Sequence, residues 1–452
     1  MIGTIFTNIF AALIVLGVII VIHELGHFLV AKAFGIRVEA FSVGFGPRLF
    51  GYKYGDTDYR ISAFPLGGYV KMSGEMPGEE VTGDPREFLS KPKWQRFLVA
   101  FAGPAMNGVL AVALLTGLYM YGSEVEEWFQ SPAVVGVVES GSPAEAAGIL
   151  PGDRIVEIAG KADPTWQAVL TEVALSPDLR LPVRLDRQGS LVNVTLTPSR
   201  QPRDETGYSG LLPDVPTMVA GFSFPDSPAE GAGLLPGDII VGVGDTELGP
   251  AAPPIDEIVQ GYPRERLPIT VMRGDQRLFL EVGTTTNPNG QRVMGINLGV
   301  PTVTIELGAV DAFSRSLDVN GENAMLIFEI LGRLVRRETS MRSLDGPIGI
   351  IRVSGQMFEE GFAPLLSLMA LISLNLGIIN LLPIPILDGG VMLLLTIEGI
   401  MRQDLSLAVK ERIVQVSFVF LLALIVVVIY NDVVKLMPPG AAPATNTEPA
   451  SP

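Results

Sequence analysis

Four long apolar runs constrain this chain more than any other feature of its sequence. Residues 5–22 carry no charge, and their apolar run continues to about Val30. Further runs cover 97–121, 363–382 and 413–430. A helix of about 17–25 apolar residues can cross the hydrocarbon layer of a bilayer. Because only 18% of all residues are charged, we expect a polytopic α-helical membrane protein with about four transmembrane helices.

Composition restricts the chemistry. The formal net charge of −16 leaves no basic surplus to neutralise phosphates, so we expect no nucleic acid partner. The chain has no cysteine, so any metal ion must be held by histidine and carboxylate side chains. Only two histidines occur in 452 residues, His23 and His27, and both lie in the first apolar run. Histidine chemistry is therefore confined to that run.

The distribution of positive charge predicts the orientation of the spans. Residues 31–96 hold ten Lys or Arg, and the loop before the fourth run holds Arg402, Lys410 and Arg412. Positively charged loops favour the cytoplasmic side. The long segment between the second and third runs is therefore expected outside.

This outer segment contains an internal repeat. Residues 142–155 and 227–240 match at 11 of 14 positions, with an offset of 85. In each copy Ser-Pro is expected to open a short helix, and Pro-Gly-Asp to form a turn into a strand. Two copies indicate paired modules, because a solenoid needs at least three units. The repeated run resembles that of PDZ domains, so we expect two outer-facing PDZ (α+β) domains, at 124–205 and 208–300.

The other segments are defined by composition. Residues 305–337 form an amphipathic stretch expected to lie on the outer membrane surface. The Pro- and Ala-rich end of the chain is expected to be disordered. The expected divisions outside the repeat are a first transmembrane helix at 1–35, a cytoplasmic loop at 36–96, a second transmembrane helix at 97–122, outer juxtamembrane helices at 301–360, a third transmembrane region at 361–400, a fourth helix at 411–436 and a tail at 437–452.

Residues 23–27 read His-Glu-Leu-Gly-His, an HExxH motif. On a helix this spacing puts both imidazoles on one face, where they can share a zinc ion, and Glu24 can accept a proton from water beside it. Ionisable groups at membrane depth cost about 2.5–3.5 kcal/mol each, so three together indicate a functional site. His23 lies about 14 Å from Lys32 at the inner interface. We therefore expect the site inside the bilayer, towards the cytoplasm.

A hydrolytic zinc site needs a third protein ligand, which here must be a carboxylate. Residues 386–400 offer Asp388 and Glu398. Pro383 and Pro385 make this stretch either a bent continuation of the third span or a re-entrant piece. Asp388 is the stronger candidate, because the two glycines after it let a helix approach closely; a helix-capping role is the alternative. Glu398 is nearer the cytoplasmic loop and is expected to be solvated.

Several motifs together resemble the site-2 proteases, a family of intramembrane zinc metalloproteases. HExxH in the first span, N-x-x-P-x-x-x-L-D-G from Asn380 to Gly389 and the outer PDZ pair resemble most the bacterial regulator of sigma-E protease group. At Val391 the chain departs from the group, where relatives often carry a polar residue; this position is not a ligand. Further stretches that resemble the group lie at 41–47, 65–72, 102–107, 345–350 and 373–390, so the resemblance covers nearly the whole chain to about Leu436.

The resemblance implies His23, His27 and Asp388 as ligands of one zinc ion per chain and Glu24 as the general base. It implies regulated intramembrane proteolysis of single-span membrane proteins, such as an anti-sigma factor, after a first outer cleavage. It also implies a multi-pass protein of the bacterial inner (plasma) membrane, with periplasmic PDZ domains and the active site towards the cytoplasm. The PDZ pair is expected to act as a size filter for substrates.

A substrate helix must be held extended before it can be cut. Residues 59–64 alternate, 65–68 read as a turn and 69–72 can return as a second strand. We therefore expect a membrane-associated β-hairpin whose edge can accept a substrate strand, with an ordinary cytoplasmic loop as the alternative. Asn380 can bond the substrate backbone or, alternatively, a neighbouring helix. The candidate substrate-binding residues are Gly67, Gly68, Tyr69 and Asn380.

Two other classes of function compete with a protease. A catalytically silent membrane scaffold would use the PDZ pair to bind C-termini or unfolded segments, but it would not need HELGH and LDGG in lipid. A zinc transporter usually carries inverted repeats among its spans, which the sequence does not show. Metal content per chain and chelator-sensitive cleavage of a single-span protein separate these readings.

Overall fold

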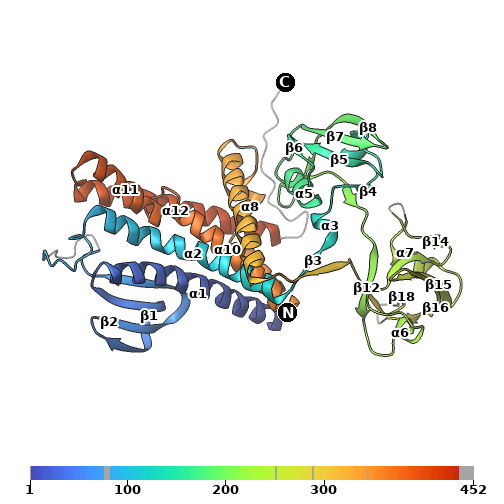
Figure 1. The fold of residues 1–452 in the computed structure, drawn as a ribbon, viewed down its shortest axis with the longest axis horizontal. Helices are drawn as coiled ribbons and strands as arrows, with labels where there is room; N and C mark the ends of the chain where they lie inside the picture. The colour runs from blue at the N-terminus through green and yellow to red at the C-terminus, as the bar shows by residue number, and fades with distance from the viewer. Residues whose placement is uncertain (1, 76–81, 250–251, 288–289, 344, 437–452) are drawn as a thin grey trace, which may run out of the picture. The chain divides into compact units, whose positions relative to one another are not determined.

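The computed structural model describes residues 2–75, 82–249, 252–287, 290–343 and 345–436 (Figure 1). The predicted tail at 437–452 lies outside these residues. The chain divides into two compact units, which are described separately. The helical unit comprises Met1–Ser123, Glu306–Leu334 and Met341–Pro452, and the β-rich unit comprises Glu124–Ile305 and Val335–Ser340.

Four helices of the helical unit are long and apolar enough to cross a membrane, counted over the described residues. They confirm the four predicted spans. Their long apolar stretches form helices because every backbone group of a helix is bonded within the segment, which hydrocarbon requires. The four helices are α1 (Ile2–Ala33), α2 (Lys93–Tyr121), α10 (Phe362–Asn380) and α12 (Leu407–Leu436).

Shorter helices complete this unit. Helix α8 (Ala309–Val335) exposes the apolar side chains of Phe313, Leu317, Met325 and Phe328, in line with the predicted amphipathic stretch. Helix α9 (Pro347–Glu360) packs against α1, α10 and α12. A 3-10 turn, η1 (Met341–Ser343), precedes it. Helix α11 (Asp388–Met401) follows the proline-containing break after α10, so the stretch at 386–400 forms a helix of its own.

A two-stranded sheet follows α1 along the chain. Strands β1 (Val38–Tyr54) and β2 (Thr57–Met72) are antiparallel, and both bend, so that residues 40–43 pair with 58–61 on one side and residues 38–43 pair with 68–72 on the other. A β-hairpin does follow α1, but it is not the predicted one: its turn lies at Gly55-Asp56, and the stretches 59–64 and 69–72, expected to pair across a turn at 65–68, both belong to β2. A positive φ of 61° at Gly55 suits a two-residue turn, whereas Gly67 permits only a bend within β2.

Helix α2 lies among three other helices of the unit and contacts α1, α10 and α11 (Figure 1). Its approach to α1 is closest at Gly26, where a Cβ atom would lie 2.3 Å from the Ala102 carbonyl oxygen. Such a separation is far below van der Waals contact, so only glycine fits. The HExxH segment of α1 is therefore pressed directly against α2.

The β-rich unit contains the two copies of the repeat, and their elements correspond one to one. The first copy consists of β4 (Val135–Val138), α4 (Pro143–Ala146), β5 (Arg154–Ile158), β6 (Lys161–Ala162), α5 (Trp166–Ala174), β7 (Leu181–Arg187), β8 (Ser190–Leu196), β9 (Ser199–Arg200), β10 (Gly207–Tyr208) and β11 (Leu211–Pro213). The second consists of β12 (Thr217–Phe222), α6 (Pro228–Gly231), β13 (Ile239–Val243), β14 (Thr246–Glu247), α7 (Ile255–Gly261), β15 (Arg266–Arg273), β16 (Gln276–Gly283), β17 (Thr285–Thr286), β18 (Arg292–Val293) and β19 (Ile296–Gly299).

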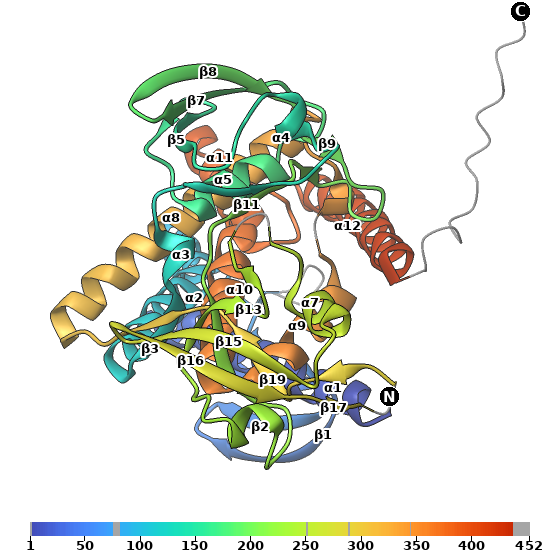
Figure 2. The same cartoon turned by 90° about the vertical axis from the view of Figure 1, so that its right-hand side faces the viewer.

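Strand pairing repeats between the copies as well (Figure 2). Strands β5, β7 and β8 are neighbours in one sheet, as are β13, β15 and β16 in the other, and the last strand of each copy pairs with its first. Because β11 pairs with β4, the first copy extends to Pro213. The predicted boundaries, an end at 205 and a new start at 208, therefore cut through its last strands. Whether the modules are PDZ domains stays a prediction.

The repeated motif has a structural role in each copy. Ser142 and Ser227 cap the short helices α4 and α6 by accepting the backbone N–H three residues on, which confirms the helix start predicted at Ser-Pro. The aspartates of the Pro-Gly-Asp turns are buried, and an arginine donates two hydrogen bonds to each: Arg187 to Asp153 at 2.8 and 2.7 Å, and Arg273 to Asp238 at 2.7 and 2.8 Å.

These arginines set the ionisation of the two carboxyl groups. The Arg273 guanidinium holds the pKa of Asp238 below its ordinary value, against the opposing effect of burial. Burial alone would raise the pKa of Asp153, but hydrogen bonds from Arg187 and the Leu150 amide lower it. Each copy thus contains its own ion pair between a buried aspartate and an arginine.

Two further strands and a short helix begin and end the β-rich unit. Strand β3 (Ser123–Glu126) enters it and β20 (Thr302–Ile305) leaves it, and the two are paired. Helix α3 (Glu127–Gln130) follows β3 and packs on α5 of the first copy. The residues at which the chain enters and leaves the repeat are therefore neighbours.

Candidate metal centre

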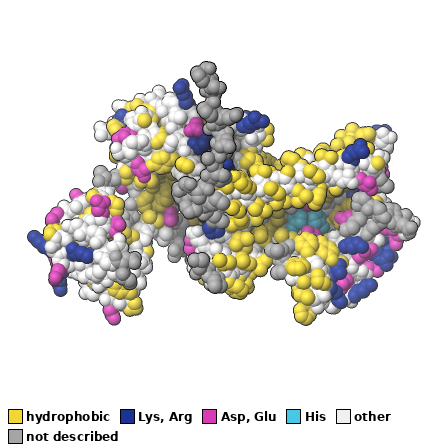
Figure 3. Space-filling view, turned by 180° about the vertical axis from the view of Figure 1, so that it is seen from behind, with side chains coloured by type: hydrophobic (Ala, Val, Ile, Leu, Met, Phe, Trp, Pro, Cys, Tyr) yellow, Lys and Arg dark blue, Asp and Glu magenta, His cyan; other side chains and the backbone are white. Residues whose placement is uncertain are grey.

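The two histidines lie one turn apart on α1, as the HExxH spacing predicts. Their rings meet edge to face with centroids 4.8 Å apart, and their Nε2 atoms are 3.2 Å apart. His23 is buried, with 7% of its surface exposed. Figure 3 shows the histidine side chains in cyan in a gap between apolar surfaces. The Nε2 atoms of both histidines are therefore close enough to bind the same metal ion.

Asp388 completes this group from the first turn of α11. Its Oδ2 lies 3.1 Å from His23 Nε2, and its Oδ1 lies 3.5 Å from His27 Nε2. One donor atom from each of the three residues lies within 4.8 Å of the others, and no other such cluster of His, Asp or Glu occurs in the described residues. The structure thus brings together the three ligands predicted from the sequence.

The glycines after Asp388 allow the tight loop that precedes it. A Cβ atom at Gly389 would lie 2.3 Å from the Leu381 carbonyl oxygen, and one at Gly390 would lie 2.2 Å from that of Ile384. The close approach expected at these glycines is therefore made by the backbone of the loop 381–387. This packing fixes the start of α11, and with it the position of Asp388.

The donor set fits a zinc ion. Bonds of about 2.0–2.1 Å in a tetrahedral site place ligand atoms about 3.3 Å apart, and the three separations here are 3.1, 3.2 and 3.5 Å. His27 Nδ1 lies 2.8 Å from the Val99 carbonyl oxygen, so this nitrogen donates its hydrogen there and leaves Nε2 free for a metal. Since Val99 acts through a backbone atom, its side chain gave no sequence signal for this role.

Glu24 lies beside the triad but is not part of it. Its Oε2 accepts a hydrogen bond of 3.1 Å from the Val70 backbone N–H. Zinc, when bound, acidifies water and polarises a peptide carbonyl. A carboxylate next to the ligands, but outside their cluster, is suited to take a proton from water.

The predicted substrate-binding residues of the hairpin lie in β2. Gly67 and Gly68 are buried, and a Cβ atom at Gly68 would lie 3.4 Å from Glu24 Cγ. Tyr69 stacks on Phe45, with ring centroids 6.0 Å apart. Because the Val70 N–H is donated to Glu24, it points away from β1 at the free edge of the sheet. These residues therefore lie next to the base; that they bind substrate stays a prediction.

Asn380 is the last residue of α10 and is half-buried. The tight loop that starts after it leads to Asp388. Its role in substrate binding also stays a prediction.

Glu398 is not solvated, as the sequence had suggested, but is 1% exposed. Its Oε1 accepts hydrogen bonds from Lys410 Nζ at 2.6 Å and from the Leu405 backbone N–H at 2.9 Å. The prediction failed because a buried carboxylate needs a cation, and the cation comes from the next helix. Glu398 therefore links α11 to α12 and is not a metal ligand.

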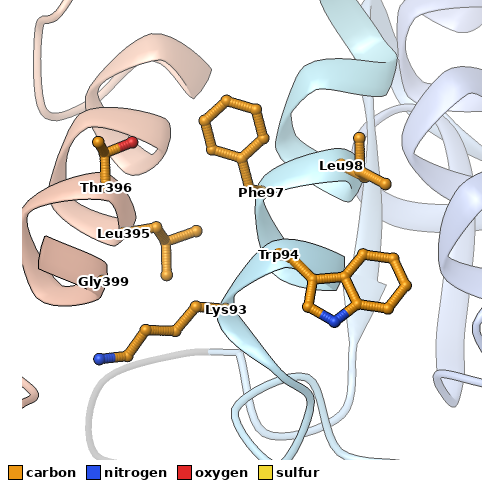
Figure 4. A pocket seen from close by; sticks show the side chains of 7 residues that line it. All are labelled: Lys93, Trp94, Phe97, Leu98, Leu395, Thr396 and Gly399. Atoms are coloured by element: carbon orange, nitrogen blue, oxygen red, sulfur yellow. The ribbon is translucent and has the colours of Figure 1, made fainter. Parts of the chain in front are cut away.

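An apolar hollow of about 480 Å³ lies between α2 and α11 (Figure 4). The Lys93 ammonium at its rim is bonded to Asp404 at 2.8 Å and to the Glu398 carbonyl oxygen at 2.9 Å. Its lining contains none of the metal-binding residues, so it is separate from the metal centre. The residues that line it are Lys93, Trp94, Phe97, Leu98, Leu395, Thr396 and Gly399.

Three side chains that could hold a metal ion, on two apolar helices and with a carboxylate beside them, are the arrangement expected of a membrane-embedded metallopeptidase. Comparison of the chain with protein families supports the same conclusion. The family model of peptidase family M50 matches residues 11–424, and the chain belongs to this family. It is a metalloprotease of the site-2 type, which confirms the resemblance found in the sequence.

Relatives match over nearly their whole length. The regulator of sigma E protease of Haemophilus influenzae is 32% identical, over 94% of this chain and 98% of the relative. The regulator of sigma-E protease RseP of Escherichia coli is 32% identical over the same shares. A Treponema pallidum protein, with zinc metalloprotease in its name, is 30% identical over 94% and 98%. Zinc is thus the metal that both the donor set and the relatives support.

Proposed function

We propose that this protein is an intramembrane zinc endopeptidase that cuts single-span proteins of the bacterial inner membrane, with one zinc ion per chain. The observation that carries the proposal is the triad of His23 and His27 on the membrane-spanning helix α1 and Asp388 on α11, with Glu24 between it and a free sheet edge. The names of two relatives favour an anti-sigma factor as the class of substrate. The active site faces the cytoplasm, and the repeat faces the periplasm.

The test is cleavage of a purified single-span protein by the purified enzyme in liposomes. Cleavage should occur within or next to the span, stop on chelation and return on addition of zinc. Mass spectrometry of the fragments gives the bond that is cut. Cleavage of soluble proteins alone, or cleavage that persists without metal, would contradict the proposal.

Strand addition to β2 is the proposed way of holding substrate. A helix exposes no backbone groups for recognition, so the segment to be cut must be extended. At the edge 68–72 the Val70 amide donates to the carboxylate of the base at 3.1 Å, and a substrate carbonyl oxygen would have to take the place of that carboxylate. A substrate strand on this edge, aided by Gly67, Gly68 and Tyr69, would run past Glu24 and the metal, and Asn380 would bond its backbone.

Replacement of one amide tests strand addition. Val70→Pro removes the edge N–H, and Val70→Ala keeps it while also removing the side chain; an edge strand tolerates proline. Val70→Pro should raise KM well above that of Val70→Ala, with equal zinc content in both; a loss confined to kcat would show that the amide only positions Glu24 and would contradict strand addition. Equal cleavage by the two variants would refute strand addition at this edge.

The repeat is proposed to act as a size filter that admits substrates already shortened by a first outer cleavage. Two folded modules between α2 and α8 are suited to exclude bulky outer domains by steric hindrance. The pairing of β3 with β20 allows residues 127–301 to be replaced by a short flexible linker. This deletion variant should cut full-length substrate without the first cleavage. Loss of cleavage even of trimmed substrate, with zinc still bound, would contradict the filter.

A hollow in the second copy favours a rival role, capture of a substrate C-terminus. It measures about 560 Å³ and lies between α7 and the strands β17 to β19. A C-terminal strand could add to β19 there. A peptide that copies the trimmed C-terminus of a substrate, titrated onto the whole enzyme, separates the two roles. Saturable binding that is lost on replacing the exposed lining residue Leu298 by Arg (Leu298→Arg) favours capture over filtering.

A further inference from the structure

The stretch Ala-Gly-Pro-Ala-Met-Asn at 102–107 has no role in the mechanism described above, yet it lies on the side of α2 that faces the histidines. Asn107 is 0% exposed. Its side-chain amide lies 3.2 Å from Nδ1 of His23, the ring nitrogen that does not face the metal site. A polar side chain at membrane depth is costly unless it is bonded, so this contact needs an explanation.

The tautomer of His23 supplies that explanation. When Nε2 of an imidazole binds a metal, Nδ1 carries the hydrogen and needs an acceptor. The Nδ2 atom of Asn107 is the one near Nδ1, whereas its buried Oδ1 has no hydrogen-bond partner in the described part of the chain. A half-turn of the amide exchanges the two ends. The oxygen then accepts from His23 Nδ1–H, which satisfies both groups.

Asn107 is fixed in place by a third helix. Its backbone oxygen accepts a hydrogen bond of 2.9 Å from the buried Ser373 hydroxyl of α10. At Gly377 of α10, a Cβ atom would lie 3.0 Å from the Pro104 oxygen and 3.3 Å from Asn107 Cβ. The amide is therefore held against His23 by close packing of α10.

Gly103, one turn before Asn107, faces the other ring nitrogens. A Cβ atom here would lie 2.3 Å from His27 Nε2 and 2.7 Å from His23 Nε2. These separations approach the length of a zinc–nitrogen bond, about 2.0–2.1 Å. A methyl group at residue 103 would therefore occupy the space in which a metal meets both imidazoles.

We infer that α2 supplies the second wall of the metal centre through two positioning residues: Asn107 fixes the His23 tautomer that presents Nε2, and Gly103 keeps the adjoining space open for the ion. With the Val99 carbonyl on His27 Nδ1, each histidine then has an acceptor from α2. The inference concerns the binding of zinc and does not depend on which substrate is cut.

Asn107→Leu tests the first role, because it keeps the size of the side chain and removes the acceptor. Its zinc affinity, measured by competition with a chelator, should fall about 10–100-fold, as is typical for loss of such an outer partner. Asn107→Asp keeps an acceptor and should retain tight binding. The visible absorption of the cobalt-substituted enzyme should change in Asn107→Leu and remain native in Asn107→Asp.

A matched variant on the same helix controls for packing. Thr116→Val removes the 2.8 Å hydrogen bond between the Thr116 and Ser316 hydroxyls, farther along α2. It should bind zinc like the native chain. Native affinity in Asn107→Leu would overturn the role of Asn107, as would an equal loss in Asn107→Leu and Asn107→Asp.

Gly103→Ala tests the second role against Gly108→Ala, where an added Cβ would have no neighbour within 4 Å. Zinc binding should be lost in Gly103→Ala and native in Gly108→Ala. Far-ultraviolet circular dichroism and hydrogen exchange of α2 report whether Gly103→Ala is still folded. Stoichiometric, tight zinc in Gly103→Ala would show that the space is not needed. Failure of Gly103→Ala to fold while Gly108→Ala folds would show that Gly103 serves helix packing rather than the ion, and would overturn the second role.

Discussion

Asp388 and Asp238 are both carboxylates shielded from solvent, but they face different partners. The side chain of Asp238 is 1% exposed, and Arg273 donates two hydrogen bonds to it within one repeat copy. The side chain of Asp388 is 21% exposed and faces two imidazoles on another helix. One carboxylate is neutralised by a cation of the same module, and the other faces two imidazoles with which it could hold a metal ion.

This difference teaches how the partner of a buried carboxylate indicates its role. The Arg273 guanidinium is always charged and neutralises the Asp238 carboxylate, so this pair has a structural role. Two neutral imidazoles do not balance the charge of the Asp388 carboxylate, which fits the proposal that a metal ion does so. The two sites should therefore respond in opposite ways to substitution, which the following predictions use.

The largest effect is expected at Asp388. Asp388→Asn should lose tightly bound zinc and all detectable cleavage, because an amide is a much weaker ligand than a carboxylate. The hydrogen exchange of the β-rich unit should not change. Metal content per chain and cleavage of a single-span substrate provide the measurements. Glu398→Gln is the control in the same helix and should keep its zinc; the reverse pattern would move the site along α11.

Glu24→Gln should separate binding from catalysis. All three ligands remain, so zinc content should stay near native, while cleavage falls about 10²–10⁴-fold with loss of the base. If zinc and activity disappear together, Glu24 has a structural role and its assignment as base is wrong.

A third substitution, at the Asp238 site, should change stability and leave zinc binding unchanged. Arg273→Met leaves the buried Asp238 carboxylate without its cation and should clearly lower the free energy of unfolding of the second copy. Zinc content should not change. Hydrogen exchange of β13 and β15 in the whole protein measures the effect. Arg277→Met is the matched control: its 3.4 Å pair with Glu247 is exposed, so the loss should stay below about 1 kcal/mol. Equal effects of the two would contradict the role of the Asp238 pair.

The smallest expected effect is the pH dependence of the stability of the second copy, which appears only in acid. Because Arg273 lowers the pKa of Asp238 in the folded state, the carboxylate contributes its full stability above the unfolded pKa of about 3.9 and loses it as pH falls towards the folded value. The second copy should therefore lose stability below about pH 4, and Arg273→Met should reduce that slope. An unchanged slope, measured by hydrogen exchange between pH 3 and 6, would rule out this linkage.

Local spacing was enough to predict much of the metal centre. The i,i+4 pair of His23 and His27 needs only a helix, and the absence of other histidines and thiols left a carboxylate as third ligand. Asp388 was then found among few candidates, since membrane segments hold few acids. The four spans could also be predicted from local sequence, because the length of an apolar run is enough to identify a membrane-spanning helix.

Features that depend on contacts distant in sequence were missed. Nothing near Glu398 in the sequence indicates Lys410 as its partner, so its burial was not foreseen. The turn of the hairpin was misplaced because Pro65-Leu66-Gly67-Gly68 and Gly55-Asp56 both contain turn residues, and pairing decides between them. Gly103 and Asn107 share one face of α2, and an Asn in an apolar span was the available signal; their relation to His23 needs the packing of three helices.

The separate cores of the two repeat copies have a consequence for their evolution. The core of the first copy is drawn from residues 133–211 and that of the second from 219–294, with no residue in common. After a duplication, each descendant would therefore be selected for stability on its own. Substitutions that reshape the hollow of the second copy can accumulate while the first stays unchanged, so relatives are expected to diverge faster around α7 than at the paired aspartate and arginine of either copy.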